Sequence, residues 1–425
     1  PPDHTTINRF RKLLENDSSD LLTQFVEMLI QEGHVNLKNI YIDGTKIESA
    51  AGRYTFVWRK SVENYQKKLK EQLTNELGLP EDSSLEYVTE CLKQAFNNIR
   101  NTCKSKNIAF VYGIGKRKTQ FQRDYENMKE KLDKLQKYEE HLTIMGDRNS
   151  YSKTDHDATF MRMKEDHMLN GQLKPAYNIQ LASSGAFIVG VMGSQKANDL
   201  HTLKPFLDQM MPRYGGYLAN IVADAGYESV ENYAYLREKW LKSYIKPSNY
   251  ETSKKKASKH DIGKKDNMVY LEKEDVYICK NGKKLTRTKD QVRKYESGFV
   301  DTLYSYKCFE CTGCPFNNQC IKSKKAEGGS EKQIKFSPAF EEYRNQSSHN
   351  ITTEEGIIQR INRSIQAEGM FSKLKDGLKY DRFRHRGMKG VISDITLMAI
   401  GINLNKLHSK LTKNQTGVIE YKKVA

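Results

Sequence analysis

The order of short apolar segments between residues 174 and 250 constrains the fold of this chain more than any other feature. Two strand-like segments, 176–182 and 187–192, flank Ser183-Ser184-Gly185, a pattern typical of a β-hairpin. The segments that follow alternate in type: a helix at 200–211, a strand at 217–224, a helix at 230–241 and a strand at 242–247. A hairpin followed by alternating helices and strands predicts an α/β fold built on one mixed sheet with flanking helices.

A charged, strongly helical stretch at residues 60–145 interrupts this pattern. Its apolar residues follow a coiled-coil spacing that only Glu139 breaks. The spacing is formed by Phe121, Tyr125, Met128, Leu132, Leu135 and Leu142. Because Pro80 and its polar neighbours mark a turn, we predict a helical, coiled-coil-like hairpin inserted into the sheet domain.

Changes in composition predict seven segments along the chain. Short strands at 276–279 and 303–307 lie in a polar stretch that is rich in lysine and glycine. The predicted segments are the end of an N-terminal helical region (1–40), the first strands of the sheet domain (41–59), the helical insertion (60–150), the main part of the sheet domain (151–250), a β-rich insertion with a cysteine cluster (251–350), C-terminal helices of the sheet domain (351–408) and a frayed basic tail (409–425).

The charge balance favours an anionic partner. The 425 residues include 70 Lys and Arg against 53 Asp and Glu, a net charge of +17. Nucleic acid is the leading candidate, although a ribosome-associated or membrane-surface protein has the same balance. No apolar run is long enough to cross a bilayer, and no secretory signal is visible. The chain begins at Pro1, which favours a fragment.

Two aspartates end apolar strands beside small residues. Asp43 lies in Tyr41-Ile-Asp-Gly-Thr45, and Asp224 lies in Ile221-Val-Ala-Asp-Ala-Gly-Tyr227. An aspartate there is costly to bury unless a cation or hydrogen bonds compensate its charge, and small neighbours let a large charged substrate approach. A turn or helix-cap role explains either residue alone, but two in one α/β region favour a shared site.

Glu368 is the third candidate acid. A helix predicted at 354–376 has an apolar face, and Glu368 falls where that face expects an apolar residue. Lys375 lies two turns further along the same face. The face is formed by Ile361, Ile365, Phe371 and Leu374. Helix geometry alone leaves two interpretations open, a solvated glutamate at the edge of the face and a functional carboxylate.

Three carboxylates suit metal-dependent phosphodiester chemistry. That chemistry needs an activated water or 3′-hydroxyl and a stabilised leaving oxygen, and two Mg²⁺ ions supply both. Magnesium prefers hard oxygen ligands. We therefore predict two Mg²⁺ (or Mn²⁺) ions at Asp43, Asp224 and Glu368. The His-Glu-x-x-His spacing of zinc hydrolases is absent from the sequence.

The seven cysteines are unevenly distributed. Three of them, Cys91, Cys103 and Cys279, stand alone. The other four form a cluster: Cys308, Cys311, Cys314 and Cys320. An odd count with one tight cluster fits a reducing compartment better than a disulfide framework. Structural zinc held by four thiolates and metal-free thiols both remain open. The last spacing and Pro315 do not fit the ferredoxin iron–sulfur pattern.

Long blocks of the sequence resemble DDE transposases of bacterial insertion sequences. The first block is similar to the "DGTKIEANA…YTFVW" type of one subfamily. The blocks are Asp43-Gly-Thr-Lys-Ile-Glu-Ser-Ala-Ala-Gly-Arg-Tyr-Thr-Phe-Val-Trp58, Thr154-Asp-His-Asp-Ala-Thr-Phe-Met-Arg-Met-Lys-Glu-Asp166, Lys174-Pro-Ala-Tyr-Asn-Ile-Gln180, Val222-Ala-Asp-Ala-Gly-Tyr227 and Ala367-Glu-Gly-Met-Phe-Ser-Lys-Leu-Lys375. They extend over nearly the whole chain.

This resemblance implies an RNase H-like fold and a transposase activity. Asp43 would lie on the first strand, Asp224 on the fourth, and Glu368 on a helix after an insertion. All three would be catalytic residues and metal ligands. The implied partners are double-stranded DNA, at transposon ends and in the target, and a second copy of the chain in a homodimer on the DNA. The implied location is the bacterial cytoplasm, at the nucleoid.

The sequence departs from the family pattern in two places. Many relatives carry a Tyr-x-x-Arg-x-x-x-Glu-x-x-x-x-x-x-Lys signature, in which Lys375 matches the last position. The arginine position is Ser364 here, with Arg363 one residue early, and the tyrosine position is Ile361. A cut-and-paste pathway in which the DNA end forms a hairpin is therefore not favoured. The helical DNA-binding domain with which relatives usually begin is also not visible.

A cluster of arginines follows the Glu368 helix. Arg382, Arg384 and Arg386 lie close in sequence, and guanidinium groups beside an active site suit phosphate contacts. With Lys375, they are the predicted DNA-binding residues, and a solvated basic loop is the alternative.

Two other functions remain open at this point. An inactive or domesticated DNA-binding remnant of a transposase would keep the basic residues without catalysis. A structural zinc protein of the RNA machinery would explain the cysteines, but it has no need of acids at strand ends.

Overall fold

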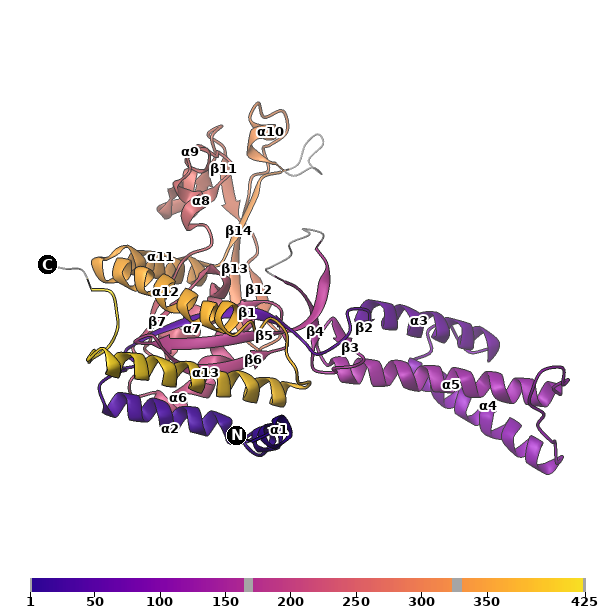
Figure 1. Cartoon of the computed structure of the whole chain (residues 1–425). Coiled ribbons are helices and arrows are strands. Elements are labelled where there is room, and N and C mark those ends of the chain that lie inside the picture. Colours follow the sequence, from indigo (N-terminus) through magenta and orange to yellow (C-terminus); the bar gives the residue numbers. More distant parts are fainter. Residues whose placement is uncertain (1, 164–170, 323–330, 423–425) are drawn as a thin grey trace.

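The computed structural model describes residues 2–163, 171–322 and 331–422, and it describes the backbone but not the side chains of Glu368 and Asp376. Figure 1 shows a central sheet covered by helices, a helical arm that projects to one side, and a β-rich lobe above the sheet. The mixed α/β fold is therefore confirmed. Within the described residues, no helix combines the length and the apolar character that a membrane crossing requires.

The central sheet has six strands, with β1 in the middle. Its order is β4-β5-β1-β7-β8, and β6 pairs with β5. Strand β1 is antiparallel to β5 and parallel to β7, and β7 is parallel to β8. The strands are β1 (Asn39–Glu48), β4 (Thr159–Arg162), β5 (Leu173–Ser184), β6 (Phe187–Ser194), β7 (Asn220–Ala223) and β8 (Lys242–Ile245). The predicted hairpin at 176–192 is the antiparallel pair β5–β6.

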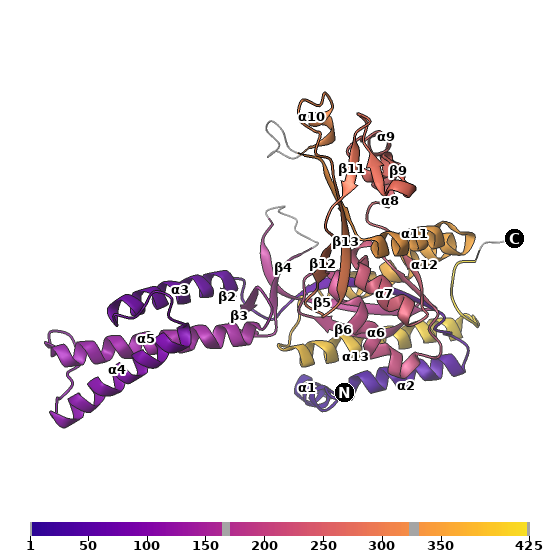
Figure 2. The ribbon, with the colours of Figure 1, turned by 180° about the vertical axis from the view of Figure 1, so that it is seen from behind.

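Helices cover both faces of this sheet. Helix α12 packs across β1, β5 and β7, with α11 beside it, while α13, α2 and α6 lie on the opposite face (Figures 1 and 2). These helices are α2 (Ser18–Gln31), α6 (Leu203–Tyr214), α11 (Pro338–Thr352), α12 (Glu354–Ser372) and α13 (Met388–Thr412). Helix α1 (His4–Leu13) lies beside α2, and α7 (Val230–Glu238) connects β7 to β8.

The burial of β1 explains its central place. Ile40 and Ile42 are fully buried in the main core, which includes α2, α6 and α13. Tyr41 belongs to a second, smaller cluster on the α12 side. Because a central strand is covered on both faces, its apolar residues run nearly without interruption.

The arm contains three helices rather than the predicted two. They are α3 (Arg59–Glu76), α4 (Leu85–Ser105) and α5 (Gln120–Met145), joined to the sheet domain through the paired strands β2 (Phe56–Trp58) and β3 (Ser150–Ser152). The turn at Pro80 separates α3 from α4, because the Ser84 side chain caps α4 by accepting from the N–H of Tyr87. A second break before Gln120 then produces α5. The predicted hairpin did not anticipate this break.

The predicted coiled-coil spacing in α5 does pack, but against two helices. Leu135 is buried with Leu69 and Leu73 of α3 and with Val88 and Leu92 of α4. At the tip, Tyr125 packs against the rings of Phe96 and Phe110. Phe121, the first residue of the spacing, is 38% exposed.

The lobe is a second six-stranded sheet, entirely antiparallel. Its strands are β9 (Val269–Leu271), β10 (Val276–Ile278), β11 (Lys284–Arg287), β12 (Gln291–Lys294), β13 (Val300–Lys307) and β14 (Gln333–Phe336). The strands predicted at 276–279 and 303–307 are β10 and part of β13. The lobe ends at Phe336 rather than at residue 350, because Ser337 caps α11 and Pro338 begins it.

The C-terminal segment, which we expected to be frayed, is anchored to the sheet domain. The Lys410 side chain is 2% exposed and donates to the Gly417 carbonyl oxygen. Asn362 and Gln366 of α12 donate to the carbonyl oxygens of Tyr421 and Ile419. The two bonds from α12 were not predictable from local sequence, because their partners lie more than 50 residues away.

Candidate active site

Asp43 lies in the middle of β1, on the face that α12 covers. Its side chain is 17% exposed, and its Oδ1 accepts from the backbone N–H of Gly44 at 2.9 Å. Asp43 is paired with Leu181 of β5 on one side, and the pairing of β1 with β7 on the other side ends two residues earlier, at Tyr41.

Asp224 directly follows β7, the parallel neighbour of β1. It caps the short helix η2 (Ala225–Tyr227), and its Oδ1 accepts from the N–H of Gly226 at 2.8 Å. This helix-cap role was one alternative for Asp224, and the structure shows it. Only one carboxylate oxygen is used in the cap, because Oδ2 faces Arg363.

Arg363 of α12 brings the two aspartates into one site. A single guanidinium nitrogen lies 3.8 Å from Oδ2 of Asp43 and 3.6 Å from Oδ2 of Asp224. The two carboxylates therefore face the same small space, with one positive charge between them. The Nε of Arg363 is buried and has no hydrogen-bond partner within the part of the chain that the structure describes.

Glu368 lies on α12, the helix that carries Arg363. The helix packs across β1 and β7, and its last turns continue into a π-helical turn, Lys373–Gly377, that contains Lys375. The side chain of Glu368 lies outside the described part of the chain, so the structure places the helix but not this carboxylate.

A polar network lies beside Gly44, next to the aspartates. The carboxylate of Asp199 accepts from the side-chain amides of Asn178 at 2.8 Å and Gln180 at 2.9 Å. The hydroxyl of Tyr227 donates to the other end of Gln180. The network therefore holds a fourth, half-buried acid near the site through one of its carboxylate oxygens.

The surroundings of Tyr227 change the pKa of its hydroxyl group. Burial raises the pKa of Tyr227 well above its usual value, and the nearby charges of Asp199, Asp43 and Asp224 raise it further. The hydroxyl therefore stays protonated and remains a donor to Gln180.

Close contacts leave no room for side chains at two glycines of the site. A Cβ atom on Gly44 would lie 2.3 Å from the Gln180 amide nitrogen and 2.7 Å from Asp199 Oδ1. A Cβ atom on Gly226 would lie 2.9 Å from Asp224 Oδ1. The small residues that flank the two aspartates in the sequence are thus required by packing around the carboxylates.

The arginine cluster contacts the end of β1, not Asp43. Arg382 donates to the carbonyl oxygens of Ser49 and Ala51, and Arg386 donates to that of Ala50. At the rise of a strand, the nearby Glu48 is about 17 Å from Asp43. Arg384 is exposed. Two of the predicted DNA-binding arginines therefore hold the 49–51 backbone.

The block at 154–163 anchors the same region. Asp155 is buried and accepts from the hydroxyls of Ser49 and Tyr177 and from the N–H of Gly387. Asp157 accepts from the N–H of Met388. Both acids thus lie at the beginning of α13, where a helix favours negative charge. Residues 164–166 of this block lie outside the described residues.

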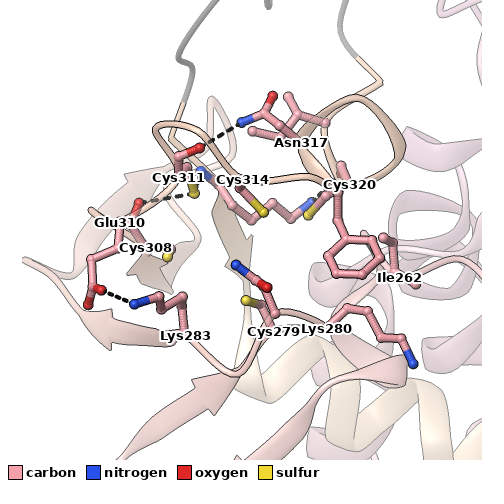
Figure 3. Close-up of a pocket in the computed structure, with 14 residues that line it drawn as sticks. Ile262, Cys279, Lys280, Lys283, Cys308, Glu310, Cys311, Cys314, Asn317 and Cys320 are labelled. Atoms are coloured by element: carbon pink, nitrogen blue, oxygen red, sulfur yellow. Dashed lines mark hydrogen bonds and ion pairs between the residues drawn. The ribbon is translucent and has the colours of Figure 1, made fainter.

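The four clustered cysteines share one pocket with a fifth. Cys279, from the end of β10, lies across this pocket from the turn that carries Cys311 and Cys314 (Figure 3). All five are free thiols, and burial raises the pKa of Cys308 to about 11. Within the described part of the chain, no three acidic, histidine or cysteine side chains converge closely enough to form a metal-binding group.

Four side chains of the aspartate site were not among the residues predicted from the sequence. Arg363 was noted only as a displaced signature residue. Asn178 and Gln180 alternate with apolar residues in a strand that is buried on both sides, and this pattern could have marked them. Asp199 carries no local signal, because only the fold brings it to Gly44.

Comparison with known proteins adds independent support. Residues 278–408 match the family model of a transposase DDE domain. This range includes most of the lobe, α11, α12 with Glu368, and most of α13, whereas Asp43 and Asp224 lie outside it. No curated protein and no solved structure matches the chain. The family match supports a DDE transposase.

Proposed function

We propose that this chain is a transposase of the bacterial insertion-sequence type, which cuts DNA at transposon ends and joins those ends to a target. Asp43, Asp224 and Glu368 are its catalytic residues and hold two divalent metal ions, Mg²⁺ or Mn²⁺. The observation that carries this function is the pair of aspartates on adjacent parallel strands, held around one arginine by the helix that bears Glu368.

The donor set fits such ions. Two carboxylates that face one space repel each other unless a cation lies between them, and Arg363 now supplies that charge. Carboxylate oxygens are the ligands that Mg²⁺ prefers. When bound, two such ions activate the attacking water or 3′-hydroxyl and stabilise the leaving oxygen.

Each residue of the chain has a distinct role in this proposal. Asp43, on the central strand, would be shared by the two ions, and Asp224 and Glu368 would each contribute to holding one of them. Arg363 would leave the carboxylates to the bound ions and would contact a DNA phosphate instead. Its buried Nε, which has no partner within the described residues, supports this shift because few bonds must be broken.

The strand order supports an RNase H-like arrangement as part of the proposal. Among β1, β5, β6, β7 and β8, Asp43 lies on the first strand and Asp224 follows the fourth. The excess of basic residues supports double-stranded DNA as the partner. Two copies of the chain, one on each transposon end, complete the proposed complex.

The test is a cleavage and gel-shift assay on labelled DNA that carries the flanks of this chain's own reading frame. With Mg²⁺, the full-length protein should cut at a defined end. Asp43→Asn, Asp224→Asn and Glu368→Gln should each abolish cutting but keep DNA binding, because phosphate contacts supply most of the affinity.

Glu355→Gln is the matched control for Glu368→Gln. Glu355 lies on the same helix and pairs with Lys242 at 2.9 Å near the surface, so its loss should leave cleavage unchanged. Normal cleavage by the Glu368→Gln protein would refute the assignment. Binding without cleavage by the unaltered protein would favour a DNA-binding remnant.

A further inference from the structure

Five of the seven cysteines of the chain line one pocket in the lobe. Four come from the turn after β13, and Cys279 comes from the end of β10, a separate hairpin. The other two, Cys91 and Cys103, lie on α4 in the arm. In structural zinc sites, thiols from two separate chain segments bind one metal ion, which joins those segments.

The backbone on the Cys279 side forms a tight turn. The N–H of Cys279 donates to the Lys283 carbonyl oxygen at 2.9 Å, and the N–H of Gly282 donates back to the Cys279 carbonyl oxygen at 2.9 Å. Gly282 has a φ of +71°, which suits glycine. The turn is therefore well defined, and it holds Cys279 at the pocket.

The opposite side of the pocket is also formed by a turn. The N–H of Cys314 donates to the Cys311 carbonyl oxygen at 3.2 Å, and Gly313 between them has a φ of +71°. The backbone N–H of Lys332 lies 3.3 Å from the sulfur of Cys311 and donates to it. The same sulfur lies 3.6 Å from the Cys308 carbonyl oxygen and donates to it, so two backbone groups hold the Cys311 side chain at the pocket.

The charges around the pocket suit a negatively charged thiolate group. Lys280, Lys283 and Lys332 line it together with Glu310, whose carboxylate pairs with the Lys283 ammonium group at 2.6 Å, so the lysines are in excess. The ammonium group of Lys332 donates to the Cys320 carbonyl oxygen at 3.2 Å. A four-thiolate zinc site carries net negative charge, and nearby lysines offset that charge.

The lobe also has little core of its own. Its buried cluster consists of Tyr277, Leu285, Tyr306, Cys308, Cys311 and Ile334. Two of these six residues are themselves cysteines of the pocket. Small folds with so few buried apolar residues usually need a disulfide or a metal to hold them.

We propose that this pocket is a structural zinc site and that Cys279 is one of its ligands. Four thiolates bind the ion, Cys279 and three of Cys308, Cys311, Cys314 and Cys320, and each loses its proton to solvent. Because the thiols do not converge in the part of the chain that the structure describes, binding requires side-chain rotations that bring four of the sulfurs together inside the pocket.

The test measures metal on the full chain, purified with a thiol reductant and without chelator. Elemental analysis should find about one zinc per chain, as expected for a single tetrahedral site. Cys279→Ser should lose most of this zinc. Cys91→Ser is the matched control, because it removes a thiol outside the pocket, and it should keep the full zinc content.

Cobalt substitution keeps the test decisive if Cys279→Ser does not fold. Cobalt in the unaltered protein should give the visible bands of a tetrahedral thiolate site. Cys279→His should still bind cobalt but lose about a quarter of the sulfur-to-cobalt charge-transfer intensity, because one of four thiolates is replaced.

Three outcomes would overturn the inference. They are an unaltered protein that neither contains nor binds zinc, iron in place of zinc, and a Cys279→Ser protein with full zinc and an unchanged cobalt spectrum. All three readouts are independent of DNA cleavage, so the result does not depend on the proposed activity.

Discussion

The carboxylate site of the sheet domain and the cysteine pocket of the lobe differ in how their donors are held. Asp43 lies on a strand paired on both sides, and Asp224 is fixed as a helix cap. The cysteines lie in turns and at the end of one short strand, around a small core. If the two proposed metal sites exist, the two aspartates are arranged before any metal binds, whereas the cysteines would need the metal to bring them together.

The largest expected effect tests whether the two sites are independent. Asp224→Asn should lower DNA cleavage by about a thousandfold or more, because the lost metal interactions are worth several kcal/mol. The zinc content of the same protein should not change. Cleavage rates and elemental analysis of one preparation measure both quantities. A parallel loss of zinc would show that the two sites are coupled.

A buried ion pair next to Asp224 provides the second test. The Glu228 carboxylate accepts from Arg344 of α11 at 2.7 and 2.9 Å and from the Ser248 N–H at 2.8 Å. Glu228→Gln leaves Arg344 without its partner and should cost about 3 kcal/mol of unfolding free energy at neutral pH. Urea unfolding measures this loss.

The pH dependence of this effect has a defined sign. Burial alone would raise the pKa of Glu228, but the hydrogen bonds from Arg344 and Ser248 outweigh burial and lower it. The stabilisation is therefore present above the unfolded-state pKa and disappears as the pH falls through the folded-state pKa. The deficit of Glu228→Gln should shrink in acid. Glu342→Gln is the control, because Glu342 lies on α11 near Arg344 but forms an exposed ion pair with Arg237. Its loss should leave the free energy of unfolding almost unchanged.

The close packing around Asp43 predicts a smaller effect. Gly44→Ala would place a methyl group against Gln180 and Asp199, and it should cost about 2 kcal/mol because the buried network must shift. Cleavage should also fall, since Asp43 is the adjacent residue. Thermal unfolding and cleavage measure both. Gly216→Ala is the control, because a Cβ atom there meets nothing within 4 Å in the described structure. Equal stability of both variants would mean that the site is not rigid.

Short-range sequence patterns predicted individual helices and strands near the candidate site. The hairpin β5–β6, the strands that carry Asp43 and precede Asp224, and the helix of Glu368 all follow from apolar spacing and turn residues. The acids themselves stand out because a charge in or next to a buried strand is costly, although Asp43 lies in the middle of its strand and not at the predicted end.

Contacts between distant segments were not predictable in this way. Asp199 reaches Gly44 only through the folded sheet, and Cys279 joins the other cysteines only because β10 and β13 belong to one lobe. Arg382 and Arg386 have the composition of a DNA-binding loop, yet they bind backbone carbonyl groups. Residue type gives the chemistry of a side chain, and the fold decides its partner.

The C-terminal anchor at Lys410 gives the smallest expected effect. Lys410 is buried, with its ammonium group 3.1 Å from His34 Nδ1 and 2.5 Å from the Gly417 carbonyl oxygen. Lys410→Met keeps the length of the side chain but removes both contacts and a buried charge. These two effects oppose each other, so stability at neutral pH should change by no more than about 1 kcal/mol.

The alkaline range separates the two effects at Lys410. Burial lowers the pKa of Lys410, so the folded protein releases this proton at a lower pH than the unfolded chain does. Between the two pKa values the unfolded chain binds more protons, and stability rises with pH. Urea unfolding across this range should show that rise in the unaltered protein and a smaller one in Lys410→Met. Equal slopes would mean that the Lys410 ammonium group is not buried in solution. The tail would then be held only by its hydrogen bonds to α12. In that case it would resemble the turns of the cysteine pocket and not the paired strands near the aspartates.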